Sequence, residues 1–452
     1  MQRLLTLAFF ACVITLWNGC SPDETDTNST TAKNRTEQTE SAVANEYFAH
    51  SITLTKGTAG FTPPVAARTY GYLGLTLYEA VVGGIPDHKS LQGAVQGLKA
   101  GDLPAPESGK TYHWGECANR ALSVMMLKLY PTASLDDLAA VTATERKYED
   151  LFQQEVDEET FDRSKNYGTA LAEAMFKYAA SDGQSRAFTS NFPATYVAPI
   201  FVGAWVPTPP AFQKIPLQPY WGNVRTFHTQ SVTATQPPAH PAYSTDPNSA
   251  FYKEGVEVLN VSKSLTEEQK KIANYWSDDP GKTATPPGHS ISIARIVLEK
   301  EKANLALAAE TYAKTGMAVH DAFVSCWKCK YDFNLMRPVT YIRQTLGEPG
   351  WNSILPTPPF PEYSSGHSVQ SGAMAAVLSE IFGSNYGFTD NTHASRTDID
   401  GAPRTYRSFT EAAQEAAISR LYGGIHYKAG IDFGVEQGKK VGQVITALPM
   451  KK

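Results

Sequence analysis

The amino-acid sequence predicts an all-α fold, a helical bundle with long proline-rich ordered loops. Apolar residues recur at helical spacing over much of the chain, strand signals are scarce, and no internal repeat divides the sequence. Hydrophobic residues make up 42% and charged residues 19% of the 452 residues. This composition is typical of a globular protein with a substantial core, arranged as one large domain or two joined ones.

The first half of the predicted fold, residues 45–250, contains several helices followed by an irregular connection. Apolar residues recur at helical spacing from about 65 to 80. Between about 186 and 250 the chain is crowded with prolines and aromatic residues. Because Trp205 and Trp221 are unlikely in free solvent, we expect this stretch to be a long ordered loop. Similar apolar spacing predicts three further helices, at about 113–130, 134–155 and 159–182.

The second half of the predicted fold comprises residues 251–452 and is again helical. Apolar periodicity marks helices that are bounded by turn and capping residues. The predicted helices lie at about 265–277, 290–302, 304–330, 366–382, 409–422 and 430–447.

The N-terminus indicates an exported protein. An apolar stretch from Leu4 to Trp17, preceded by a basic residue and followed by Cys20, gives residues 1–20 the form of a secretory signal. A glycine before Cys20 is typical of bacterial lipoprotein cleavage sites, where the cysteine is lipidated and becomes a membrane tether. The residues just upstream fit that pattern poorly, so plain secretion remains an alternative. Residues 21–44 are polar and predict a disordered tether. Together with the signal sequence, this tether predicts a protein in the periplasm or at the cell surface.

Charge and cysteine content exclude several classes of protein. The net charge of −5 gives no reason to expect a nucleic acid as partner, so any anion site must be a local cluster of cations. Outside the signal region only Cys117, Cys326 and Cys329 remain, too few for a disulfide scaffold. Cys326 and Cys329 form a C-x-x-C pair, which fits either a redox motif or two small buried residues with an optional disulfide.

Lys330 is the first residue that suggests chemistry. It follows Trp327 by three residues and Phe323 by seven, which places it on the buried stripe of a helix. A lysine there is costly unless an anion meets it. Arg337 follows seven residues later, before a proline that forces a turn. Alone, the pair also fits a lysine at a helix end and an arginine on a loop.

Two further segments have the same character. Ser365-Gly366-His367 precedes a strongly helical run, so its backbone N–H groups and hydroxyl could cradle an anion, with His367 passing protons. Ser365 as a simple helix cap is the alternative. Arg420 lies in the last turn of another predicted helix, and His426 follows the Gly-Gly that ends it. An arginine followed by a histidine is common by chance, so this segment is weak alone.

In order, the three segments resemble the motifs of the superfamily shared by vanadium haloperoxidases and type 2 phosphatidic acid phosphatases. The usual middle motif is Pro-Ser-Gly-His, and Ser364 replaces the proline here. The resemblance implies vanadate, or a phosphoryl group, as the bound oxyanion. It implies that His426 binds vanadium apically, or attacks phosphorus, and that His367 handles protons. The residues that it assigns to the oxyanion's oxygens are Lys330, Arg337, Ser365, Gly366 and Arg420.

Several features favour the haloperoxidase over a secreted acid phosphatase that acts through a phospho-histidine. Trp327 three residues before Lys330 resembles the haloperoxidase version of the motif, and Phe360 matches the apolar wall expected near the halide. Both also fit simple core packing. The resemblance implies hydrogen peroxide and a halide as substrates, with iodide expected over bromide because the chain resembles the bacterial marine iodide-oxidising branch. Tyr275 is expected at the entrance of the pocket, or in ordinary packing. A similar Pro-Pro-Gly-His segment ending at His289 stands in the wrong order, so His289 is interpreted as a helix-entry residue.

Overall fold

A computed structural model describes residues 35–452, and the predicted signal peptide and residues 21–34 lie outside the described residues. The all-α prediction is confirmed. In the described part, the one sheet is an antiparallel pair of short strands, in which Phe388 pairs with Tyr406 and Asp390 with Arg404. The elements are η1 (Thr36–Gln38), α2 (Ala42–Gly57), α3 (Pro63–Val81), η2 (Val82–Gly84), α4 (Trp114–Leu129), α5 (Leu135–Phe152), α6 (Glu158–Ala180), η3 (Ala187–Thr189), η4 (Trp221–Asn223), α7 (Gln230–Thr233), α8 (Ala250–Lys263), α9 (Glu267–Tyr275), α10 (Thr285–Lys300), α11 (Leu305–Phe333), α12 (Pro338–Thr345), α13 (Gly366–Phe382), β1 (Phe388–Asp390), β2 (Arg404–Tyr406), α14 (Phe409–Tyr422) and α15 (Lys428–Thr446).

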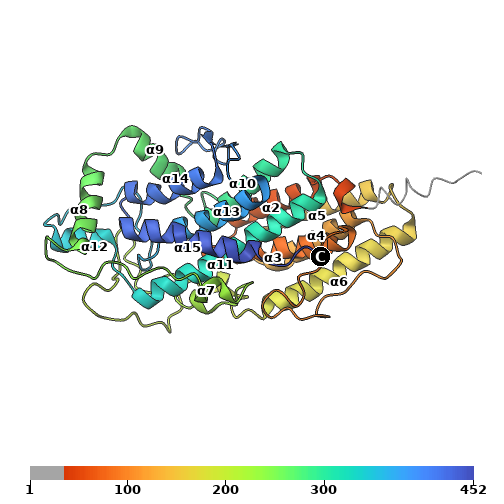
Figure 1. The fold of residues 1–452 in the computed structure, drawn as a ribbon, viewed down its shortest axis with the longest axis horizontal. Helices are drawn as coiled ribbons and strands as arrows, with labels where there is room; N and C mark the ends of the chain where they lie inside the picture. The colour runs from red at the N-terminus through yellow and green to blue at the C-terminus, as the bar shows by residue number, and fades with distance from the viewer. Residues whose placement is uncertain (1–34) are drawn as a thin grey trace, which may run out of the picture.

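The long helix α11 runs through the middle of an elongated molecule (Figure 1). Helices α2 to α6 form one end, and α8, α9 and α12 form the other. The Asn304 side chain caps the start of α11 by accepting a hydrogen bond from the backbone N–H of Leu307, and Asn334 ends the helix in a left-handed conformation. Along its length α11 packs against α3 and α13. Gly74 permits the approach to α3, because a Cβ there would lie 2.4 Å from the Tyr312 carbonyl oxygen.

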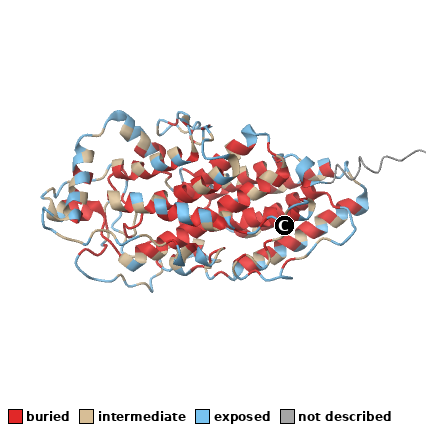
Figure 2. Ribbon diagram, viewed as in Figure 1, coloured by how far each residue is buried: buried red, intermediate tan, exposed pale blue. Residues whose placement is uncertain are grey.

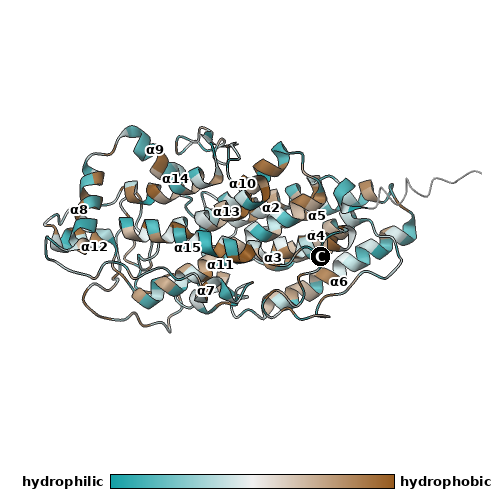
Figure 3. Ribbon diagram, in the orientation of Figure 1, coloured by the Kyte–Doolittle hydropathy of each residue, from teal (hydrophilic) through white to brown (hydrophobic). Residues whose placement is uncertain are grey.

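Helix α13, which the sequence motifs place at the site, is fixed by close packing against α15. A Cβ at Gly438 would lie 1.9 Å from the carbonyl oxygen of Val369, so only glycine allows the two backbones this contact. Figure 2 shows that the central helices are buried almost all round. Figure 3 shows outer helices such as α5 and α6 with alternating polar and apolar faces, as expected for helices with one solvent-exposed side.

The proline-rich stretch between the two sets of helices is an ordered loop, as predicted. Trp205 and Trp221 are both buried, and short helical turns interrupt the loop at η3, η4 and α7. Apolar side chains from both halves of the chain join one hydrophobic cluster that extends from Val43 to Met450. Of the described helices, none combines the length and the apolar character needed to span a bilayer.

Some helix boundaries differ from the sequence-based ones. Helical structure already begins at Thr36, which is buried and donates a hydrogen bond to the Val81 carbonyl, so the segment predicted as tether is ordered from residue 35 on. Helix α8 was not predicted, because only four of its residues are buried and its apolar stripe is narrow. Helix α10 begins before residue 290, since two prolines occupy its first turn and their fixed φ suits that position.

Candidate active site

The three motif segments meet at one cavity of about 350 Å³. Gly366 and His367 reach it from the start of α13, Arg420 from the end of α14, and His426 from the loop before α15. Trp327 lines the same cavity from α11. Residues almost a hundred positions apart therefore line one cavity. The order of the motifs suggested this arrangement but could not establish it.

Lys330 is fully buried and holds the segment that leads into α13. Its Nζ donates to the carbonyl oxygens of Pro361 (3.0 Å), Glu362 (2.8 Å) and Ser364 (2.5 Å). An ammonium has three donors, so all of them are occupied by the backbone. Burial lowers the pKa of Lys330 to about 8. Its charge therefore acts on the cavity mainly through space, and a direct bond to an anion requires one carbonyl contact to be exchanged.

Arg337 is fully buried beside His426. Its Nε donates to the Phe360 carbonyl (2.8 Å) and its Nη1 to the Ile425 carbonyl (2.9 Å), and Nη1 also lies 3.1 Å from His426 Nε2. Its Nη2 is buried without a hydrogen-bond partner. Burial lowers the pKa of Arg337 to about 10, which leaves the guanidinium charged at neutral pH. One donor of a buried cation is thus free for a ligand.

The start of α13 supplies a second group of donors. Ser365 is the N-cap residue, and its hydroxyl accepts a 3.4 Å hydrogen bond from the Ser368 N–H. Gly366 is the first helical residue and lies next to the Trp327 ring. The N–H groups in the first turn of a helix lack partners within the helix and carry its positive end. This terminus therefore suits a negatively charged ligand.

His367 is half-buried in the cavity wall, and its buried Nε2 atom has no hydrogen-bond partner. Burial, reinforced by the charge of Arg420, lowers the pKa of His367 well below its ordinary value. The imidazole is therefore neutral at pH 7 and can accept a proton from a molecule in the cavity.

Arg420 adds a further buried cation to the cavity wall. Its Nε donates to the Ser419 hydroxyl (2.9 Å) and its Nη2 to the Ala273 carbonyl (3.1 Å). Burial lowers the pKa of Arg420 to about 10, while the carboxylates of Asp278 and Asp279 oppose this shift. The side chain stays positively charged and is oriented by the neighbouring helix α9.

His426 is oriented by Glu362, which the sequence analysis did not single out. Glu362 Oε1 lies 2.6 Å from His426 Nδ1 and accepts a 3.2 Å hydrogen bond from the Tyr427 N–H. Burial, followed by the charge of Arg337, lowers the pKa of His426 well below its ordinary value. We therefore assign the imidazole proton to Nδ1, so that Nε2 carries the lone pair and faces Arg337 Nη1 at 3.1 Å. Burial raises the pKa of Glu362 to about 7.

A signal for Glu362 was present in the sequence. It stands three residues before Ser365, next to the predicted anion cradle, and a buried carboxylate requires a partner. Gly430 makes room for it, since a Cβ at that position would lie 2.5 Å from Glu362 Oε1. The partner, His426, is 64 residues away, which explains why periodicity could not reveal the pair.

The residues predicted for the halide pocket divide into two groups. Trp327 and Phe360 both line the cavity, with ring centroids 5.1 Å apart. Tyr275 does not line the cavity, and its expected place at the entrance was wrong. Its hydroxyl donates to Asp390 (2.8 Å), so the side chain is turned into the core. The residues that line the cavity from this segment come just after it, from Ser277 to Pro280.

His289 is more than the helix-entry residue that the sequence indicated. It lies in the first turns of α10, but its ring is buried between the carboxylates of Asp278 (2.9 Å) and Asp390 (2.7 Å). The acids come from segments 11 and 101 residues away, beyond the reach of helical periodicity.

Comparisons with known proteins agree with this geometry. A family model described as the second helical-bundle domain of vanadium chloroperoxidase matches residues 310–451, the region that holds all three motifs. The chain belongs to the vanadium-dependent haloperoxidase family. It is similar to a bacterial vanadium-dependent iodoperoxidase of known structure, with 35% identity, a TM-score of 0.79, and coverage of 91% of this chain and 96% of that one.

Two chloroperoxidases are more distant. The vanadium chloroperoxidase of Curvularia inaequalis is 26% identical over 231 residues, and the match spans 38% of this chain and 38% of that enzyme. A bacterial vanadium-dependent chloroperoxidase of known structure shares the fold at 18% identity, with a TM-score of 0.65 and coverage of 86% of this chain and 92% of that one.

Proposed function

We propose that this protein is a vanadium-dependent haloperoxidase that oxidises a halide with hydrogen peroxide to hypohalous acid. The observation that carries the proposal is a pair of buried nitrogen atoms without partners, His367 Nε2 in the cavity wall and Arg337 Nη2 beside the cavity residue His426. Buried polar atoms normally have partners, so these atoms await a ligand. With Arg420 and the start of α13 beside them, that ligand is an oxyanion.

The residues fit vanadate. Arg337, Arg420, the Ser365 hydroxyl and the Gly366 N–H would hold its oxygens, with the charge of Lys330 behind them. His426 would bind vanadium through Nε2, because Glu362 holds Nδ1 and so fixes the ring. Bound vanadate supplies a Lewis acid that activates hydrogen peroxide toward attack by a halide.

The protein's own part is to position the reactants and move protons. His367, neutral at pH 7, takes a proton from incoming hydrogen peroxide and later returns it to the leaving oxygen. Trp327 and Phe360 form an apolar wall against which a large, weakly hydrated halide can rest. We propose iodide as the preferred halide, supported by the 35% identity to a bacterial iodoperoxidase.

A paired assay tests the proposal. The purified protein is stripped of anions and incubated with orthovanadate, and peroxide-dependent oxidation of iodide and bromide is followed beside hydrolysis of an aryl phosphate without vanadate. We expect vanadate-dependent halide oxidation, faster with iodide, that disappears in His426→Ala. A matched control is His50→Gln, which changes a half-buried histidine bonded to Thr144. Rapid phosphate release without halide turnover would instead identify an acid phosphatase that uses His426 as nucleophile.

We also propose that the protein is exported and tethered to a membrane through lipidated Cys20. The support is the signal-like N-terminal sequence described above. In a bacterial host, the wild-type chain should fractionate with membranes, and Cys20→Ser should be released to the soluble fraction. Equal distribution of the two chains would contradict the tether.

A further inference from the structure

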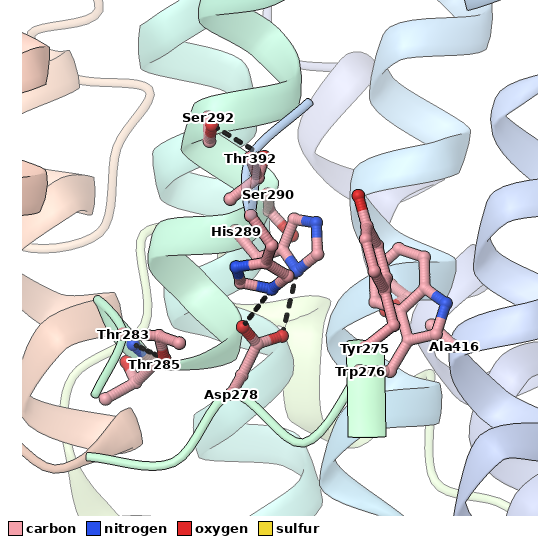
Figure 4. Close-up of polar contacts among 12 residues, drawn as sticks. Tyr275, Trp276, Asp278, Thr283, Thr285, His289, Ser290, Ser292, Thr392 and Ala416 are labelled. Atoms are coloured by element: carbon pink, nitrogen blue, oxygen red, sulfur yellow. Dashed lines mark hydrogen bonds and ion pairs between the residues drawn. The ribbon is translucent and has the colours of Figure 1, made fainter. Parts of the chain in front are cut away.

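A second group of chemically active side chains lies beside the cavity. It consists of Asp278, from the segment after α9, His289 on α10, and His393 in the loop after β1. Each residue is at most 2% exposed. Figure 4 shows Asp278 directed at the His289 ring, with Tyr275 and Trp276 to one side. We call these three residues the Asp-His-His cluster.

The ligand atoms of the cluster lie close together. Asp278 Oδ2 lies 2.9 Å from His289 Nδ1, Asp278 Oδ1 lies 3.2 Å from His393 Nε2, and the three side chains offer atoms within 4.8 Å of one another. In a tetrahedral zinc site with bonds of about 2.0–2.1 Å, neighbouring ligand atoms lie about 3.4 Å apart. The two separations between Asp278 and the histidines are slightly shorter than that value, and the atoms that the three residues offer lie no more than 4.8 Å apart.

One contact of the cluster is not an ordinary hydrogen bond. Asp278 Oδ1 and His393 Nε2 are buried, and neither has a hydrogen-bond partner of acceptable geometry, although they approach each other. A ligand that binds both atoms would explain why they lie this close together without forming a well-oriented hydrogen bond. A cation of suitable size satisfies both atoms.

The surroundings hold the ligands as metal ligands are usually held. His289 Nε2 lies 2.7 Å from Asp390 Oδ2, which also accepts a hydrogen bond from the Tyr275 hydroxyl. A histidine that binds a metal through one nitrogen typically donates from the other to a carboxylate. The Trp276 ring stacks on the His289 ring at 4.4 Å and 18°, which fixes the plane of the imidazole.

We propose that the Asp-His-His cluster binds a divalent transition-metal cation of the zinc type, at a site next to the oxyanion cavity. Two histidine nitrogens and one carboxylate oxygen form a donor set that suits zinc and its neighbours better than calcium or magnesium. The cation would join three distant segments of chain. One of them, Ser277 to Pro280, lines the oxyanion cavity, so the metal would fix that wall.

A proton-bridged ion pair is the competing explanation. His289 alone, protonated, could link the two carboxylates of Asp278 and Asp390. That arrangement accounts for the two contacts of His289, and the approach of His393 to Asp278 would then be a separate contact between an imidazole nitrogen and a carboxylate oxygen. A bound metal explains the positions of both histidines. The two explanations can be distinguished by measuring whether a metal ion binds.

Cobalt binding to the full-length protein tests the proposal. The purified protein is treated with chelator, saturated with orthovanadate to occupy the other site, and titrated with Co²⁺. We expect about one equivalent per chain, with the intense visible d–d absorption of a low-symmetry nitrogen–oxygen site of about four ligands. Zn²⁺ should displace the cobalt and raise the melting temperature.

Three variants locate the ion. His393→Gln should lose the cobalt absorption, and Asp390→Asn should weaken cobalt binding by about 10- to 100-fold, because it removes the partner of His289. His426→Ala is the matched control, since it alters the oxyanion cavity alone and should keep full cobalt binding. Absence of stoichiometric Co²⁺ and Zn²⁺ in the wild-type chain would overturn the proposal, as would unchanged binding in folded His393→Gln. Neither result depends on halide oxidation.

Discussion

Replacing Glu362 by glutamine tests how His426 is prepared to bind vanadium. The substitution preserves the shape of the side chain but removes the negative charge of the carboxylate, whose Oε1 accepts the 2.6 Å hydrogen bond from His426 Nδ1. Loss of a carboxylate that orients a metal-binding histidine typically costs 10- to 100-fold in affinity, which corresponds to about 1.4 to 2.7 kcal/mol. We therefore expect Glu362→Gln to fold and to bind vanadate that much more weakly.

The assay is halide oxidation measured against orthovanadate concentration, at pH 8 and at pH 6. Burial places the pKa of Glu362 at about 7, so the wild-type carboxyl is largely ionised at pH 8 and largely protonated at pH 6. The affinities of the two proteins should thus differ most at pH 8 and converge at pH 6. A matched control is Glu79→Gln, which changes another buried carboxyl, bonded to Ser90 and Leu91. Equal vanadate affinity of wild type and Glu362→Gln at pH 8 would refute the reasoning.

Three further predictions address proton transfer, pH-dependent stability and packing. His367→Gln should lower halide turnover by about 10²- to 10⁴-fold at saturating vanadate, as for loss of a general acid–base, and a small loss would assign proton transfer elsewhere. Burial raises the pKa of Glu79 from 4.5 to about 7, so the folded state binds this proton more tightly than the unfolded state. Its contribution to stability is therefore complete below pH 4.5 and is lost as pH rises through 7, by up to about 3 kcal/mol. Denaturant unfolding at pH 5 and pH 8 should show a loss of stability in the wild type that is smaller by about this amount in Glu79→Gln, because other buried carboxyls such as Glu362 titrate in both proteins. Gly438→Ala should destabilise the fold by at least about 1–3 kcal/mol, because the new methyl group meets the Val369 carbonyl, whereas Gly350→Ala, with open space around it, should be near neutral in the same urea titration.

The fold was largely predictable because its helices carry a strong periodic signal. Helices α13 and α14 begin and end where capping residues and apolar spacing place them, since Ser365 and Ser408 both act as N-caps. Helix α8 was missed because most of its surface faces solvent. The start of α10 was placed too late because Pro286 and Pro287 suggest a turn, yet the same residues are well suited to a first helical turn.

The candidate site was predictable where function depends on residue type and order, but not where it depends on pairing across the fold. Each of the three segments has an ordinary structural alternative, but in order they resemble the motifs of one superfamily, and this allowed six residues to be named: Lys330, Arg337, Ser365, His367, Arg420 and His426. Their partners could not be named in the same way.

Lys330 illustrates what pairing adds. Its burial suggested that it meets an anion, but its Nζ is occupied by the carbonyls of Pro361, Glu362 and Ser364. Those carbonyls belong to the segment that presents both Glu362 and the start of α13. The same lysine therefore fixes the carboxylate that orients His426 and the backbone donors that face the oxyanion. Its removal should disturb both sets of contacts at once, so its role in the site is structural as well as electrostatic.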